Sequence, residues 1–199
     1  MKQVKGIWKP LAIIGFSILI GYPLSWIFSS RNREVRFLNK YMSLPLAEET
    51  VYWSHYFGLD PVKMLSTKYI ESGKKEGEFR SRKNRNGTYD YGVYQLNSVL
   101  VNWAIPVYEK KFGKRPDIYS AHFQSWLACL HTRSMLNTAK EINNSKLKTN
   151  ALARMLYNIG AYGYCKKEVR NYKYFDRWNQ YYTDFSTEFF HFNKFLGVF

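Results

Sequence analysis

The chain contains little cysteine. Cys129 and Cys165 are its two cysteines, and they do not form the CxxC pair that zinc sites commonly use, so no metal site is expected. Two cysteines this far apart could pair in an oxidising compartment. The sequence leaves two alternatives, one disulfide bond or two separate buried thiols.

Acidic residues are also scarce, with 15 Asp and Glu against 30 Lys and Arg, which gives a net charge of +15. Such a charge attracts polyanions, among them nucleic acid, anionic lipid and the anionic bacterial wall. The sequence has no aromatic RNP motif and no zinc finger, so nucleic acid is not expected as the partner. The basic residues are densest from Lys74 to Arg85. This segment is either a solvated loop or a surface that recruits an anionic wall or a partner.

One stretch lacks charge altogether: residues 11–28 read LAIIGFSILIGYPLSWIF. As a helix this run spans about 27 Å, close to the hydrocarbon thickness of a bilayer. The run ends in Trp26-Ile27-Phe28-Ser29-Ser30, a poor signal-peptidase site. Residues 1–30 are therefore predicted to be an uncleaved membrane anchor. Basic residues flank both ends and do not fix its orientation, but exporting the large domain is the more economical topology.

The remaining chain is predicted to comprise a polar, basic connector at 31–44 and one domain at 45–199. Asp60 and Pro61 are a good helix start, and Gly73 is a natural stop. A short β-like stretch is expected at 91–96. Apolar spacing and breakers predict helices at about 45–57, 61–72, 98–111, 118–143, 148–159 and 166–190. The fold class is therefore mainly α with minimal strand content.

Three short motifs contain residues suited to chemistry: Glu71-Ser72, the segment Asp90–Asn97 (DYGVYQLN), and Tyr157-Asn158-Ile159-Gly160. Glu71 follows two apolar-faced residues and can be half-buried, which favours the protonated form that donates to a glycosidic oxygen. Gly92 is typical of a close backbone approach, and the Gln95 amide suits an N-acetyl group. Each residue alone also fits an ordinary structural role. Their joint occurrence in this order is more specific.

This set of motifs resembles the soluble-lytic-transglycosylase family of the lysozyme-like superfamily, especially members that serve type IV secretion and related envelope machines. The resemblance covers about residues 45–170. The motifs that carry it are GLDP at 58–61, ES at 71–72, GVYQLN at 92–97 and YNIG at 157–160.

The resemblance implies a lysozyme-like α+β domain at 45–199 with a groove for peptidoglycan. It implies cleavage between N-acetylmuramic acid and N-acetylglucosamine that leaves 1,6-anhydro ends and needs no cofactor. The anchor would hold the domain at the inner membrane, facing the periplasm or the outer side, where a secretion or division machine could be a partner. Glu71 would be the acid and base, and the supporting or substrate-binding residues would be Ser72, Tyr91, Gly92, Gln95, Tyr157 and Asn158.

Two alternatives stay open. The segment NRNGTYDYGVYQLN is also similar to C-type lysozymes, where the Asp of DYG is a second catalytic carboxylate. Asp90 matches that position, and a retaining hydrolase needs its two carboxyl groups about 5–5.5 Å apart. The other alternative is a non-catalytic scaffold that only binds glycan. For catalysis, we expect Glu71 in a cleft with Gln95 and Tyr157 facing it.

Overall fold

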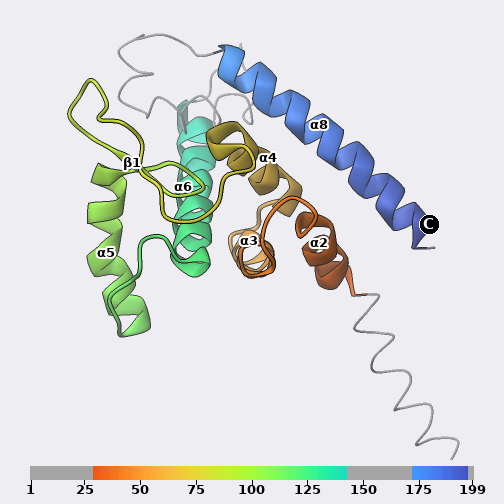
Figure 1. Cartoon of the computed structure of the whole chain (residues 1–199), viewed down its shortest axis with the longest axis horizontal. Coiled ribbons are helices and arrows are strands. Elements are labelled where there is room, and N and C mark those ends of the chain that lie inside the picture. The colour runs from red at the N-terminus through yellow and green to blue at the C-terminus, as the bar shows by residue number, and fades with distance from the viewer. Residues whose placement is uncertain (1–28, 143–171, 197–199) are drawn as a thin grey trace, which may run out of the picture.

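The computed structural model describes residues 29–142 and 172–196 (Figure 1). These residues are mainly helical with few strands, which confirms the predicted class. None of the described helices is both long and apolar enough to cross a bilayer. Apart from Ser29 and Ser30, the predicted anchor lies outside the described residues, as does the predicted helix at 148–159. The described elements are α2 (Ser30–Leu38), α3 (Leu44–Tyr56), α4 (Pro61–Ser72), β1 (Asp90–Tyr91), β2 (Leu96–Asn97), α5 (Ser98–Phe112), α6 (Ala121–Ile142) and α8 (Tyr172–Phe195).

The segment 31–44, predicted as a connector, is instead part of the folded body. Most of it belongs to α2, and Phe37 and Leu38 are completely buried in the hydrophobic core. The prediction was wrong because it followed the basic residues of this segment and overlooked a short apolar stripe between them. Arg31 and Arg36 lie on the exposed side of the helix while the apolar residues face inward.

Helix α4 lies at the centre of the helical body and contacts α2, α3 and α8. Asp60 caps its start by accepting a hydrogen bond from Val62 N (2.8 Å), with Pro61 in the first turn, as predicted. Its buried residues are Pro61, Val62, Met64, Leu65, Ser66, Thr67 and Lys68. The helix is therefore enclosed along most of its length, and only its last turn reaches the edge of the core.

The predicted β-like stretch is a tight antiparallel hairpin. Asp90 pairs with Asn97 and Tyr91 with Leu96, and residues 92–95 form the turn. Tyr94 points into the core and is completely buried, which raises the pKa of its phenol. Its hydroxyl shares a hydrogen bond of 2.8 Å with Thr50 Oγ1 of α3. The hairpin is thereby fixed to the helical body.

Helix α8 crosses the outer side of the body (Figure 1) and ends at Phe195, beyond the predicted 190. Phe185 packs against Tyr41 and Tyr69, with ring centroids 4.8 and 5.0 Å apart. Near its end, Phe189 lies 4.9 Å from the ring of Phe37 in α2. These aromatic contacts bind α8 to both α2 and α4.

A buried lysine links α4 to the loop that follows it. The Lys68 side chain is completely buried, and its Nζ donates to the carbonyl oxygen of Gly73 (2.8 Å). The carboxylate of Glu76 lies 3.7 Å from Nζ and also accepts hydrogen bonds from Ser43 N (2.9 and 3.1 Å). Burial lowers the pKa of Lys68, an effect that Glu76 partly offsets.

Replacing Glu76 by Gln should therefore destabilise the fold. It leaves the Lys68 cation buried without a counter-charge, a loss of about 3–5 kcal/mol in a fully buried pair. Because the Glu76 side chain is 26% exposed, we expect about 2–3 kcal/mol at pH 7, measured by urea unfolding.

Glu78→Gln is the matched control, since Glu78 is exposed and its replacement should change stability by less than about 0.5 kcal/mol. The difference in free energy of unfolding between Glu76→Gln and wild type should become smaller toward pH 10. With its pKa lowered in the folded chain, Lys68 loses its proton there before the unfolded chain does, so stability rises with pH in that window. Equal losses in the two variants would contradict the role of the pair.

Candidate active site

Glu71 lies in the last turn of α4, where α8 passes it. Its side chain is half-buried, and the Tyr174 hydroxyl of α8 donates a hydrogen bond to Glu71 Oε1. The C-terminal end of a helix carries partial negative charge, which disfavours an ionised carboxylate there. The hydroxyl donor favours the ionised form. Both influences act on one carboxyl group, an arrangement suited to holding and releasing a proton.

The hydrogen bond from Tyr174 to Glu71 is one of three that join α8 to α4 and its N-cap. Trp178 Nε1 donates to Thr67 Oγ1 (3.2 Å), and the Tyr182 hydroxyl donates to Asp60 Oδ2 (3.0 Å). Residues four apart lie on the same helix face, so these three donors of α8 reach Glu71 and Thr67 of α4 and its N-cap Asp60. Tyr174 is buried and held in place by this alignment.

Tyr174 was not among the sequence-predicted site residues. The signal that could have indicated it is the helical spacing of Tyr174, Trp178 and Tyr182 in the aromatic-rich segment. That spacing shows that these rings share a face. It does not show which residue Tyr174 contacts.

Ser72, the second residue of the first motif, binds main chain in its own segment. Its hydroxyl donates to the carbonyl oxygen of Lys68 (3.1 Å) and is 3.4 Å from that of Lys75. The side chain therefore helps to end α4. A role for Ser72 in substrate binding stays a prediction.

Gly92 stands where a side chain would clash with α6. Its φ is +67°, and a Cβ atom there would lie 2.4 Å from Cδ of Gln124 in α6. Gln124 is buried and cannot easily move, because its Nε2 donates to the carbonyl oxygen of Ile118 (2.6 Å). The glycine thus permits the close approach of the hairpin to α6.

Gln95 closes the same turn. Its φ is +47°, uncommon for a residue with a side chain, and its Nε2 donates to the carbonyl oxygen of Gly92 (2.8 Å). The side chain is half-buried. In the described part of the chain, Gln95 forms no hydrogen bond with Glu71.

Asp90 is held by two amides. Its Oδ1 accepts from Asn97 Nδ2 (2.9 Å) and its Oδ2 from Asn84 Nδ2 (3.1 Å). Both amides also donate to Thr88 Oγ1, so the carboxylate belongs to a fixed network. Within the described ranges, neither Asp90 oxygen is hydrogen-bonded to Glu71. Tyr91, beside it, is half-buried, with its ring edge toward Tyr119 (6.2 Å).

The third motif lies outside the described residues, so Tyr157 and Asn158 keep their predicted roles without a structural test. The same holds for Cys165. Cys129 is buried in α6, with its Sγ 3.8 Å from Ser54 Oγ. No group of three His, Cys, Asp or Glu side chains within 29–142 and 172–196 could hold a metal ion.

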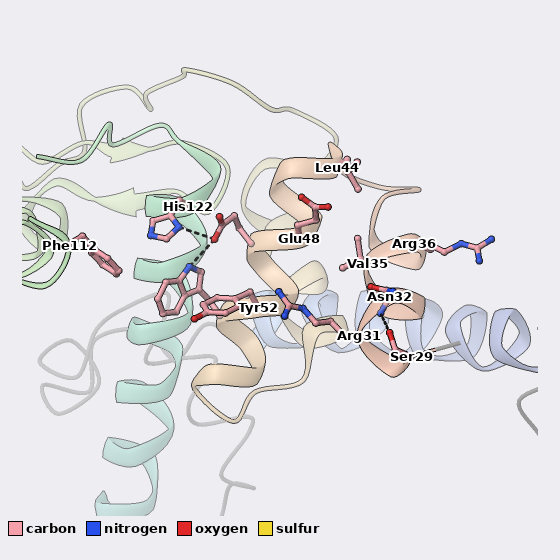
Figure 2. A pocket seen from close by; sticks show the side chains of 12 residues that line it. Ser29, Arg31, Asn32, Val35, Arg36, Leu44, Glu48, Tyr52, Phe112 and His122 are labelled. Carbon is pink, nitrogen blue, oxygen red and sulfur yellow. Dashed lines mark hydrogen bonds and ion pairs between the residues drawn. The ribbon is translucent and has the colours of Figure 1, made fainter. Parts of the chain in front are cut away.

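A pocket of about 1020 Å³ lies elsewhere, between α2, α3 and α6 (Figure 2). Glu49 stands on one of its walls, where Oε2 accepts from His122 Nδ1 (3.0 Å) and Trp53 Nε1 (3.1 Å). On another side, the Arg31 guanidinium lies 5.3 Å from the ring centroid of Tyr52. None of the sequence-predicted site residues lines this pocket. The expected cleft at Glu71 is therefore not this cavity.

No protein-family model, no curated protein and no solved structure matches the chain. Its chemistry is therefore inferred from its own residues. These are the glutamate at the end of α4, the tyrosine that donates to it, and the hairpin Asp90–Asn97 that follows.

Replacing Gly92 by Ala should destabilise the fold more than replacing Gly113 by Ala. Both glycines have nearly the same φ, +67° and +70°, but nothing lies within 4 Å of a Cβ at Gly113. The backbone strain, about 1–2 kcal/mol, is therefore shared by both variants. The clash with Gln124 should add about 1–3 kcal/mol to Gly92→Ala, measured by urea unfolding. Equal losses would show that the contact with Gln124 is easily relieved.

Proposed function

We propose that this chain is a lytic transglycosylase that cleaves the glycan strands of bacterial peptidoglycan, with Glu71 as acid and base. The observation that carries the proposal is the setting of Glu71. It is a half-buried glutamate at the end of a buried helix, with a tyrosine hydroxyl on its carboxyl group. A helical body with a small hairpin after the acid helix also supports a lysozyme-like α+β architecture for residues 45–199.

In the proposed reaction, protonated Glu71 donates its proton to the oxygen that bridges N-acetylmuramic acid and N-acetylglucosamine. The bond from the anomeric carbon to that oxygen breaks. The 6-hydroxyl of the muramic residue then attacks the anomeric carbon and gives its proton to the Glu71 carboxylate. One carbon–oxygen bond is broken, one is formed, and no water is consumed.

Tyr174 assists by orienting the acid. Its hydroxyl donates to Glu71 Oε1 and so fixes the direction in which the carboxyl group points. The end of α4 favours the protonated acid before cleavage, and the tyrosine hydroxyl supports the carboxylate afterwards. The two influences match the two roles that Glu71 takes in turn.

The hairpin would bind the sugar beside the bond that breaks. The Nε2 group of Gln95 is engaged with Gly92, so its carbonyl oxygen is the atom offered to an N-acetyl N–H. Tyr91 and Gly92 would shape this side of the groove. Ser72, Tyr157 and Asn158 would complete it.

The proposal includes the cellular setting. Residues 1–30 would anchor the chain in the inner membrane, with the catalytic domain in the periplasm or on the outer face. The positive net charge suits work on an anionic wall. A secretion or division machine that spans the envelope is the partner class we propose.

A lysozyme-type hydrolase is a second candidate because of how Asp90 is held. Two amide donors on its carboxylate stabilise negative charge, as a nucleophile or electrostatic partner in a retaining hydrolase requires. The same bonds also have a structural use, since they join the hairpin to Asn84 in the loop before it. We therefore retain the transglycosylase as the main proposal, and the products of the reaction distinguish the two candidates.

The decisive experiment digests purified peptidoglycan with the full chain in detergent and weighs the released muropeptides by mass spectrometry. The full chain keeps Ser29, which caps α2. We expect anhydro ends, lighter than reducing ends by one water, and a loss of at least about 100-fold in rate with Glu71→Gln but not with exposed Glu78→Gln. Reducing ends, lost with Asp90→Asn, would establish the hydrolase. Binding without release would favour a glycan-binding scaffold or an enzyme that waits for its partner.

Tyr174→Phe should lower kcat/KM by about 10- to 100-fold, because it removes a hydrogen bond to a charged group at the reacting centre. It should also move the alkaline limb of the pH–activity profile to higher pH, since the lost donor favoured the ionised carboxylate. Tyr182→Phe is the matched control, because it removes a donor from the same face of α8 at Asp60. A purely structural role would lower the activity of both variants equally, without moving the profile.

A further inference from the structure

The second part of the loop between α4 and β1, together with β1 itself, forms an ordered arm, residues 79–91, which we name the basic arm. Figure 1 shows it in yellow, projecting beyond the helices beside β1. Its two sides run next to each other, and its tip is closed by a turn. The main-chain contacts that hold it are Gly92 N to Phe79 O (2.9 Å), Ser81 N to Asp90 O (2.8 Å), Asn84 N to Thr88 O (2.8 Å), Gly87 N to Asn84 O (2.9 Å) and the bridge between Arg80 and Tyr91.

The side chains of the first half of the arm are sorted between two faces. Phe79 packs against the hydrophobic core, Ser81 Oγ accepts from Asp90 N (2.9 Å), and Asn84 binds the Asp90 carboxylate. In residues 79–85 the exposed residues are all cations: Arg80, Arg82, Lys83 and Arg85. The outer face of the arm is therefore a row of positive charges on an ordered backbone.

The neighbouring carboxylates do not neutralise this row. Asp90 is engaged by two amides, and Glu76 by Lys68 and Ser43 N. Glu78, directly before the arm, is exposed and forms no salt bridge within the described residues. Across residues 29–142 and 172–196, the four cations of the arm form no salt bridge. The Arg80 guanidinium lies over the Tyr89 ring, 4.4 Å from its centroid, which holds it without reducing its charge.

The four cations lie within six residues of one another and carry the same charge, so they repel, and an anionic partner reduces the repulsion. Because the backbone is already ordered, binding loses less conformational entropy than it would with a flexible loop. The guanidinium groups suit carboxylates, since the two can form paired hydrogen bonds. The arm thus fits a partner that bears several carboxylates.

The loop that carries the arm begins beside the candidate acid. Lys75 N donates to the carbonyl oxygen of Ser72 (3.2 Å), next to Glu71, and the arm ends in the hairpin strand β1. We propose that the basic arm binds the stem-peptide carboxylates of the peptidoglycan strand on which Glu71 acts. The identity of the strand rests on the proposed function, whereas binding by the arm does not require cleavage.

Binding should be measured with the full chain in detergent, carrying Glu71→Gln so that the strand stays intact. The probes are soluble glycan strands with their stem peptides, and the same strands after their carboxyl groups have been amidated with carbodiimide and ammonium. We expect about tenfold weaker binding to the amidated strands, the sum of several exposed ion pairs. This comparison needs no variant of the arm.

The triple variant Arg82→Gln, Lys83→Gln and Arg85→Gln should lose about tenfold in affinity for the untreated strands and keep its affinity for the amidated ones. It leaves Arg80 and its contact with Tyr89 intact. The matched control removes three exposed cations elsewhere, with Lys114→Gln, Arg115→Gln and Lys140→Gln. The control should bind both probes as the parent chain does.

Equal losses in the two triple variants would assign the binding to net charge and overturn the proposal. Equal affinity of the parent chain for treated and untreated strands would overturn it as well. Tighter, arm-dependent binding to a single-stranded oligonucleotide would replace the proposed partner. Arm-dependent binding to strands, combined with no muropeptide release by the chain that retains Glu71, would support the arm and contradict the proposed function.

Discussion

The fold depends on hydrogen bonds to the polar residues in the middle of α4, because this helix is buried. Ser66, Thr67 and Lys68 are completely inaccessible, and a buried polar group without a partner costs about 1–3 kcal/mol. Each of the three finds a partner in a different place. Ser66 binds the main chain of its own helix, Thr67 accepts from Trp178 of α8, and Lys68 binds the loop that follows. The hydrogen bonds of Thr67 and Lys68 fix α8 and the following loop against α4. They thereby also fix the surroundings of Glu71 at the end of α4.

Local signals were enough to predict the helices whose ends depend on nearby residues. The bounds of α3, α4 and α5 follow the prediction within one residue, because caps and breakers such as Asp60, Pro61 and Gly73 act over a few positions. Contacts between distant segments explain the errors. Helix α2 exists because Phe37 packs against the rings of α8, and α8 continues past 190 for the same reason. Neither contact can be read from sequence spacing.

The candidate site shows the same division. The sequence placed Glu71 at a helix end and Asp90–Asn97 in a β-like turn, and the structure has both. It did not indicate that the Ser72 hydroxyl turns to the main chain, or that the Gln95 amide closes its own turn. Those orientations depend on which acceptors the folded backbone presents. Tyr174 was not predicted because its hydrogen bond with Glu71 depends on how α8 and α4 align along their whole length.

The distance along the chain between these two residues has a consequence for synthesis. Tyr174 follows Glu71 by 103 residues, so a ribosome completes α4, the hairpin and α6 long before the hydroxyl donor exists. The carboxyl group of Glu71 reaches its final surroundings only after the C-terminal helix has been made and has docked. A chain that stopped before residue 172 would carry every sequence motif and still lack this donor. Completion of the candidate acid is thereby delayed until α8 has been made.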